Sequence, residues 1–321
     1  MNLTNAMAEL LYEEQTRLVD AFDRYDGDVP FRREPWQNSE LGGGRVCTME
    51  GGRVFERAGV NVSHVAGTST PPSITKTLPH LAGQPFQATG ISMVLHPLNP
   101  YAPSFHANFR YFEAGGHWWF GGGVDLTPMY GFDEDAVHFH CTLRDWCSRH
   151  PRANYPQWKA TCDEYFTIRH RGEMRGIGGV FFDQLNDPDP SAFSAYRSFV
   201  KDGLTTILPT YLPILDRRCS LPYGDRERQW QLLRRSRYAE FNLVYDRGTL
   251  FGLQTNGNIE AILISMPPLA RWGYRLQPEP GTPEDDVRRF LQPRDWVNAD
   301  LPQPRRWSDE SGLPCHEELP A

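Results

Sequence analysis

The sequence predicts an α+β fold in which one large antiparallel sheet, of roughly seven strands, is flanked on both faces by helices. The first observation behind this prediction is alternation: in SFHANFR, Phe105 and Phe109 fall on one side of a strand, whereas His106 and Asn108 fall on the other. The second is a series of glycine and asparagine turns between such runs, which are typical of hairpins. The third is a change to helical spacing after Phe132.

The N-terminal part of the chain is expected to supply a helix and a hairpin. Apolar residues at helical spacing between positions 5 and 24 predict an amphipathic helix packed on the sheet. Segments 46–49 and 54–65 predict two strands joined by a glycine turn. The glycines at 42–44 resemble a phosphate loop only superficially, because the GxGxxG and GxxxxGK[ST] orders are absent. Residues 67–86, rich in Pro, Thr and Ser, predict a surface connection.

The central strands, 89–97, 104–110 and 117–120, carry an unusual polar face. The side chains on this face can form directional hydrogen bonds or change their protonation state. They are Ser92, His96, His106, Asn108 and Arg110. Such groups among aromatic residues favour a functional cleft, and the alternative is a sheet face that is merely solvated. Asp125 follows three consecutive glycines, which remove side chains beside its carboxylate and would let a bulky ligand or another backbone approach.

The C-terminal half alternates between helical and strand patterns. Helices are expected at 133–147, 156–174, 191–217, with breaks near Pro209 and Pro213, and 223–233. Strands are expected within 175–183 and at 239–245, 250–253 and 259–266. His140 and His170 both fall on apolar helix faces, where a histidine is either a hydrogen-bonded core residue or a ligand.

Composition narrows the function classes. The formal net charge of −7 argues against a general surface for nucleic acid or anionic membranes. There is no N-terminal secretion signal and no run of about 18 apolar residues, so a soluble cytoplasmic protein without membrane insertion is expected. The six cysteines form no CxxC pair, so neither a zinc site nor an iron–sulfur cluster is indicated.

The domain organisation predicted from the sequence is simple. Residues 1–297 are expected to form a single domain, with no internal repeats and no heptads. Residues 298–321 are Pro-rich and charged, which is typical of a loosely ordered C-terminal tail.

Six long segments, in order, resemble a known family. They are GRVFERAGVNVSHVAG, HPLNPYAPSFHANFRYF, WWFGGGVDLTPMYGF, RGIGGVFFD, RYAEFNLVYDRGTLFGLQT and ILISMPPLARW. Together they are similar to the oxygen-dependent coproporphyrinogen III oxidases of haem biosynthesis, from about residue 42 to residue 297.

The resemblance implies oxidative decarboxylation of two propionates of coproporphyrinogen III to vinyl groups, giving protoporphyrinogen IX, carbon dioxide and hydrogen peroxide. It implies molecular oxygen as co-substrate and no flavin, haem or nicotinamide. It also implies a large antiparallel sheet with helices on both faces, in a homodimer whose contacts involve the region from about Tyr238 to Gly273.

An acidic tetrapyrrole needs fixed cations, and guanidinium matches carboxylate in a bidentate fork. Arg110, Arg175 and Arg247 lie beside glycine turns or on the polar strand face, so they are predicted to bind propionates. Asp125 is predicted to accept the pyrrole N–H groups at the centre of the macrocycle and to stabilise charge during oxidation. His106 matches the proton donor proposed for the family.

The resemblance implies two further sets of residues. The positions that match substrate contacts are Ser92, Asn108, Phe109 and Arg110. The positions that match four histidines proposed to bind a divalent metal in some bacterial members are His96, His106, His140 and His170.

One turn departs from the family pattern. The family usually has a glycine-containing triplet ending in arginine here, whereas this chain has Asn256, Gly257 and Asn258. The backbone amides of such a turn can still bind a carboxylate, so the three residues stay in the predicted substrate site, with one charge-assisted contact fewer.

Two other functions remain open from the sequence. One is an iron oxygenase that uses two histidines and a carboxylate, such as His96, His106 and Asp125. The other is a non-catalytic tetrapyrrole or anion carrier, in which Arg110 binds but His106 and Asp125 perform no chemistry.

Overall fold

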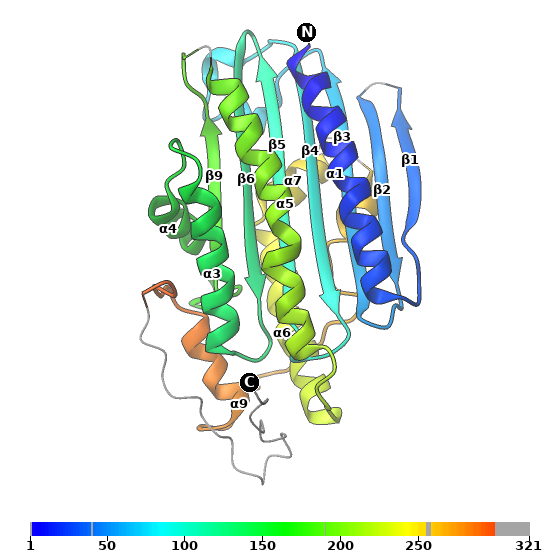
Figure 1. Cartoon of the computed structure of the whole chain (residues 1–321), viewed down its shortest axis with the longest axis vertical. Helices are drawn as coiled ribbons and strands as arrows, with labels where there is room; N and C mark the ends of the chain where they lie inside the picture. The colour runs from blue at the N-terminus through cyan, green and yellow to red at the C-terminus, as the bar shows by residue number, and fades with distance from the viewer. Residues whose placement is uncertain (1, 40, 190, 255–257, 299–321) are drawn as a thin grey trace.

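The computed structural model describes residues 2–39, 41–189, 191–254 and 258–298, and a large sheet occupies its centre (Figure 1). Within these residues, seven strands form one antiparallel sheet in the order β1-β2-β3-β4-β5-β6-β9. Their bounds are β1 Arg32–Asn38, β2 Gly42–Glu50, β3 Phe55–Gly67, β4 Phe86–Pro97, β5 Ser104–Ala114, β6 His117–Thr127 and β9 Gly179–Leu185. The predicted fold class is therefore confirmed.

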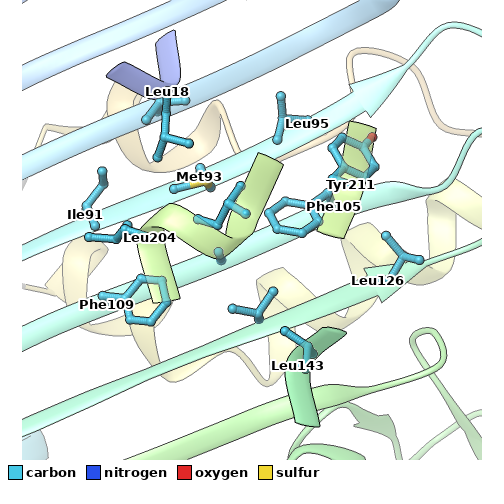
Figure 2. Packing of buried hydrophobic residues seen from close by; sticks show 14 of the residues in the cluster. Leu18, Ile91, Met93, Leu95, Phe105, Phe109, Leu126, Leu143, Leu204 and Tyr211 are labelled. Atoms are coloured by element: carbon cyan, nitrogen blue, oxygen red, sulfur yellow. The ribbon is translucent and has the colours of Figure 1, made fainter. Parts of the chain in front are cut away.

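Three long helices cover one face of the sheet, in front of the strands in Figure 1. They are α1 (Leu3–Asp26), α3 (Asp133–Ser148) and α5 (Ala192–Arg218), and α4 (Tyr155–Tyr165) packs beside β9. Alternate strand residues meet these helices in a continuous apolar core. Figure 2 shows Met93 of β4 and Phe109 of β5 among Leu18 of α1, Leu204 of α5 and Leu143 of α3. Burial of each such side chain stabilises the fold by about 1.5–3 kcal/mol.

The opposite face of the sheet is covered by helices that follow α5 in the chain. α6 (Asp225–Val244) and α7 (Arg247–Gln254) lie behind the strands in Figure 1, and α8 (Ile259–Leu263) is hydrogen-bonded to β3. Two short helical segments, α9 (Pro283–Asp286) and η2 (Val287–Phe290), follow. Two more, α2 (Pro72–Thr75) and η1 (Pro79–Leu81), lie in the connection before β4.

Three predicted strands are wrong, because segments 239–245, 250–253 and 259–266 lie in α6, α7 and α8 or in the turn after α8. Their short apolar runs were compatible with either period, and burial shows which one holds. In α6, Tyr238, Phe241 and Asn242 are buried at helical spacing, whereas Leu243 and Val244 are exposed.

Other differences have local causes. The edge strand β1 was missed because its residues, RREPWQN, are mostly exposed and show no apolar alternation. The helix predicted over 156–174 ends at Tyr165, and a small hairpin of β7 (Thr167–Ile168) and β8 (Glu173–Met174) follows. α5 continues through Pro209 and Pro213, because packing along its length outweighs the lost backbone hydrogen bonds. The glycines at 42–44 belong to β2, not to a loop.

The two faces of β5 predict losses of stability of very different size. Phe109→Ala removes a fully buried ring from the core and should lower the free energy of unfolding by about 3–5 kcal/mol. Asn108→Ala, on the other face, should cost about 1 kcal/mol or less. Urea unfolding of both variants measures the difference, and equal losses would contradict the assignment of faces.

Candidate active site

The centre of the polar sheet face is a hydrogen-bonded pair on β5 and β6. His106 lies opposite Asp125 in the strand register, and its Nδ1 lies 2.6 Å from Asp125 Oδ1. The carboxylate is buried at 2% exposure, whereas 21% of the His106 side chain is exposed. The strands therefore place a buried carboxylate directly behind a partly accessible imidazole.

Arg175 completes this centre from the connection between β8 and β9. Its Nη2 donates to both oxygens of Asp125, at 2.9 and 2.7 Å, and its Nη1 donates to Asn242 Oδ1 of α6 at 2.6 Å. The guanidinium is buried at 2% exposure. Three aromatic rings surround its central carbon, with centroids 4.2, 4.4 and 4.9 Å away: Phe166, Tyr238 and Phe241.

The charge state of Asp125 follows from these contacts. Burial alone would raise the pKa of Asp125, but the charge of Arg175 and the hydrogen bond from His106 outweigh it and lower the pKa. The carboxylate is thus ionised and can only accept hydrogen bonds, so His106 Nδ1 must carry a proton and donate it. In the neutral ring, Nε2 is then the unprotonated nitrogen.

This arrangement differs from the roles predicted for Asp125 and Arg175. Arg175 is buried and bound to Asp125 and Asn242, so it neutralises a carboxylate of the protein instead of clamping a propionate at the surface of the cleft. Both oxygens of Asp125 face Arg175 or His106, so the carboxylate orients the imidazole instead of projecting toward a ligand.

Arg110 lies on the same face, four residues after His106. Its Nη1 donates to Asn108 Oδ1 at 3.1 Å, and its Nη2 lies 3.1 Å from Asp183 Oδ1. A Cβ on Gly121 would lie 2.8 Å from the guanidinium carbon of Arg110, so this glycine makes room for the arginine. The space predicted for a flat ligand beside the glycines is therefore used, at this position, by Arg110.

Arg247 approaches the same region from α7. Its guanidinium carbon lies 4.9 Å from the ring of Tyr165 and 5.6 Å from the ring of Phe181, and the two rings stack at 4.3 Å. Arg110 also lies 6.0 Å from the Phe181 ring. Two guanidinium groups thus flank one aromatic ledge, and no ion pair joins Arg247 to an acidic side chain within the described residues.

The remaining predicted substrate residues do not all lie on the polar face of the sheet. Ser92 lies opposite Asn108 in the register, and both side chains are half-buried on the polar face. Phe109 is fully buried on the other face, in the core, so its ring is not part of the site. Asn258 caps α8 by accepting from Ala261 N at 3.1 Å. The predicted residues at 256 and 257 lie outside the described part of the chain.

His96 is fully buried at the end of β4, and both of its ring nitrogens are hydrogen-bonded. Nδ1 lies 2.9 Å from Ser104 Oγ, and Nε2 lies 2.9 Å from the carbonyl oxygen of Ser265. Burial, aided by the charge of Arg235, lowers the pKa of His96 to about 3. His96 is therefore a neutral, fully bonded side chain.

The other two histidines of the predicted metal set lie in different environments. His140 Nδ1 bonds Tyr155 Oη at 2.9 Å and its Nε2 bonds the Ile177 carbonyl at 3.0 Å. Burial lowers the pKa of His140 to about 3 as well. His170 is exposed in the turn between β7 and β8, where Nε2 lies 2.7 Å from Glu240.

The structure does not bring these four histidines together. His140 is on α3, which covers the apolar face of the sheet, whereas His106 is on the polar face. Among the described residues, no group of three or more His, Cys, Asp and Glu side chains is placed to hold a metal ion. The donor set therefore does not fit a shared metal site, and His96 equally cannot join His106 and Asp125 around iron while it bonds Ser104 and Ser265.

Comparison with known families agrees with the geometry. A family model described as coproporphyrinogen III oxidase matches residues 6–296. The chain therefore belongs to the coproporphyrinogen III oxidase family. Membership supports an oxidoreductase role in porphyrin and haem biosynthesis, with a tetrapyrrole substrate. No helix in the described part of the chain is both long and apolar enough to cross a membrane.

A groove of about 380 Å³ opens elsewhere on this coproporphyrinogen oxidase fold, between β1, β2, β3 and α8. Trp36, Glu50, Arg57 and Glu260 are among its lining residues. Neither His106 nor Arg110 lines it, and Asn258 is the one predicted site residue that does, among those described. The His106–Asp125–Arg175 centre thus lies apart from this groove.

Four residues that hold Arg175 in the site were not predicted from the sequence. Phe166, Tyr238 and Phe241 form the aromatic cage of Arg175, and Asn242 binds its Nη1. Tyr238, Phe241 and Asn242 are spaced three and four apart, which is a helical signal. That signal was available in the sequence, but the segment was interpreted as a strand.

The Asp125–Arg175 pair predicts strong coupling. Arg175→Met leaves a buried carboxylate without its cation and should lower the free energy of unfolding by about 3–5 kcal/mol. Asp125→Asn combined with Arg175→Met removes both charges, so the double variant should lose less stability than the sum of the single variants. Urea unfolding at neutral pH measures the free energy of unfolding of Arg175→Met, Asp125→Asn and the double variant. Additive losses would contradict a direct buried ion pair.

Proposed function

We propose that the chain catalyses the oxygen-dependent oxidative decarboxylation of two propionates of coproporphyrinogen III, giving protoporphyrinogen IX. The observation that carries this proposal is the His106–Asp125–Arg175 centre, which lies on the same sheet face as Arg110 and close to the ledge reached by Arg247. An oriented imidazole beside surface guanidinium groups suits proton transfer on a polycarboxylate. Family membership supplies the tetrapyrrole class of substrate.

Binding of the acidic substrate would rest on local cations, because the chain as a whole has a net charge of −7. Arg110 and Arg247 flank the ring of Phe181 and offer bidentate donors to propionate oxygens. Ser92 and Asn108, which are paired in the strand register, add uncharged hydrogen-bonding groups on the sheet face that carries His106 and Arg110. A pyrrole ring of the substrate would stack on the same ledge, in which the rings of Tyr165 and Phe181 already stack face to face.

Each decarboxylation would proceed with balanced atoms and electrons. The hydrogen on the carbon next to the pyrrole leaves with its electron pair, the carboxylate leaves as carbon dioxide, and the electrons of the broken C–C bond form the vinyl double bond. Molecular oxygen takes the departing electron pair and two protons to become hydrogen peroxide. One proton is the departing hydrogen, and His106 supplies the other from Nε2 after this nitrogen has taken up a proton from solvent, while Nδ1–H stays bonded to Asp125.

In this proposal Asp125 and Arg175 are positioning residues. Asp125 fixes the orientation and tautomer of His106, and Arg175 keeps Asp125 ionised. No organic cofactor is required, since molecular oxygen is the electron acceptor. No step is assigned to a metal ion.

The reaction is tested by incubating the purified chain with coproporphyrinogen III in air and under anaerobic conditions, followed by chromatography of the oxidised porphyrins. The wild-type chain should form divinyl product only in air. His106→Gln should lower the turnover rate roughly 10²–10⁴-fold because the proton donor is lost. His138→Gln, on the opposite face, is the matched control and should keep the wild-type rate.

Two outcomes would contradict the proposed function. Turnover that continues without oxygen would exclude oxygen as the electron acceptor. Binding of coproporphyrinogen without turnover in air would favour the non-catalytic carrier.

We also propose a homodimer, formed through the region from about Tyr238 to Gly273. Several large apolar side chains there are exposed: Leu243 and Val244 at 49% and 55%, and Leu269 and Trp272 at 55% and 56%. Clustered exposed apolar residues of this kind are typical of interfaces between protein chains. The partner proposed is a second copy of this chain.

Leu269→Glu should weaken the dimer, because a charge would be buried in an apolar contact. Leu276→Glu, which is also exposed but lies beyond the proposed contact region, is the control. Sedimentation velocity over a range of protein concentrations measures the effect. A wild-type chain that stays monomeric, or equal effects of both variants, would contradict the proposed surface.

A further inference from the structure

The segment 258–266, here called the cover, lies across the polar face of the sheet and is held by side chains of β3. Asn61 Nδ2 donates to the Ala261 carbonyl at 2.8 Å, and Arg57 Nη1 donates to the Met266 carbonyl at 3.3 Å. Ile264 packs so closely that a Cβ on Gly59 would lie 2.7 Å from its methyl carbon. The cover is therefore seated on β3 by directional bonds and by contact.

His96 of β4 makes the third and most buried of these bonds. A carbonyl oxygen can only accept, so the 2.9 Å contact between His96 Nε2 and Ser265 O requires a proton on Nε2. Nδ1 of the neutral ring then accepts from the Ser104 hydroxyl at 2.9 Å. Tyr238 packs edge-on against the same ring, with centroids 4.9 Å apart. The tautomer and orientation of His96 are thus fully determined by the protein.

The cover is continuous with a segment of the proposed substrate site. α7 begins at Arg247, which lies against Tyr165 and Phe181 beside β9, whereas α8 lies against β3. β9 and β3 are separated by β4, β5 and β6, so α7 and α8 lie on either side of the strands that carry His106 and Arg110. The two helices also pack on each other, since a Cβ on Gly252 would lie 2.6 Å from Ile262 Cδ1. Anchoring α8 on β3 therefore constrains where α7, with Arg247, can lie.

We propose that His96 is a positioning residue that anchors the cover over the active site through the Ser265 carbonyl, together with Asn61 and Arg57, and that it is not a metal ligand. This inference rests on the proposed function only for the identity of the site that is covered. A metal ion on His96 Nε2 would displace the bond to Ser265 and leave its carbonyl without this donor. A metal ion on Nδ1 would displace Ser104 in the same way.

Hydrogen–deuterium exchange of the full chain, without substrate, tests the anchor directly. The informative amides are those of Ile262, Ile264, Ser265 and Met266, which are bonded within the cover. His96→Ala should accelerate their exchange roughly tenfold, because Ser265 loses its buried donor. His96→Gln retains a side-chain N–H near the position of Nε2, so protection should return largely to the wild-type level.

Two matched variants separate anchoring from general destabilisation. Asn61→Ala removes an equivalent bond to the same cover from a residue outside the predicted set of metal-binding histidines, so it should accelerate exchange of the same amides. His140→Gln alters another buried histidine on the opposite side of the sheet and should leave the exchange of these amides unchanged.

Metal titration tests the opposing hypothesis, in which His96 is a metal ligand. Isothermal titration with Mn²⁺ and Zn²⁺ should give the same isotherm for the wild type, His96→Gln and His140→Gln. Loss of a stoichiometric binding event in His96→Gln, or exchange in His96→Gln as fast as in His96→Ala, would overturn the proposal. Neither hydrogen–deuterium exchange nor isothermal titration involves turnover. Failure of the proposed anchoring role is therefore distinguishable from failure of the proposed reaction.

Discussion

The buried ion pair between Asp125 and Arg175 is the interaction on which the rest of the site depends. Both groups are almost fully withdrawn from water, which is unfavourable unless each charge is paired and hydrogen-bonded. The pair meets that condition by joining β6, the connection before β9, and Asn242 of α6. It therefore fixes α6 against the sheet and, at the same time, keeps a carboxylate ionised behind His106.

The fold serves this centre by giving the two sheet faces separate roles. The face under α1, α3 and α5 is filled by side chains such as Phe105 and Phe109, and it makes the central strands rigid. The other face can then carry polar side chains whose spacing is set by the strand register alone, as for His106 opposite Asp125. A dense core on one side thus compensates for polar groups held out of water on the other.

Much of this division could be predicted from the sequence, because strand alternation is a local property. It correctly separated His106, Asn108 and Arg110 from Phe105 and Phe109. The roles of Arg175 and His96 could not be predicted in the same way. An arginine beside glycines and a histidine on a polar face both suggest ligand binding, and only tertiary contacts show that Asp125 and Ser265 already occupy them. The helix predicted at 223–233 is the first half of α6, whereas the end of α6 and the helices α7 and α8 were predicted as strands because their short apolar runs fit both periods.

The central claim is that an ionised Asp125 dictates the tautomer of His106. Nitrogen-15 NMR of the imidazole rings in the full chain, at a pH where the ring is neutral, measures which nitrogen carries the proton. The account predicts a protonated Nδ1 and an unprotonated Nε2 for His106, and an Asp125→Asn variant in which that preference is lost. A wild-type His106 with its proton on Nε2 would contradict the account.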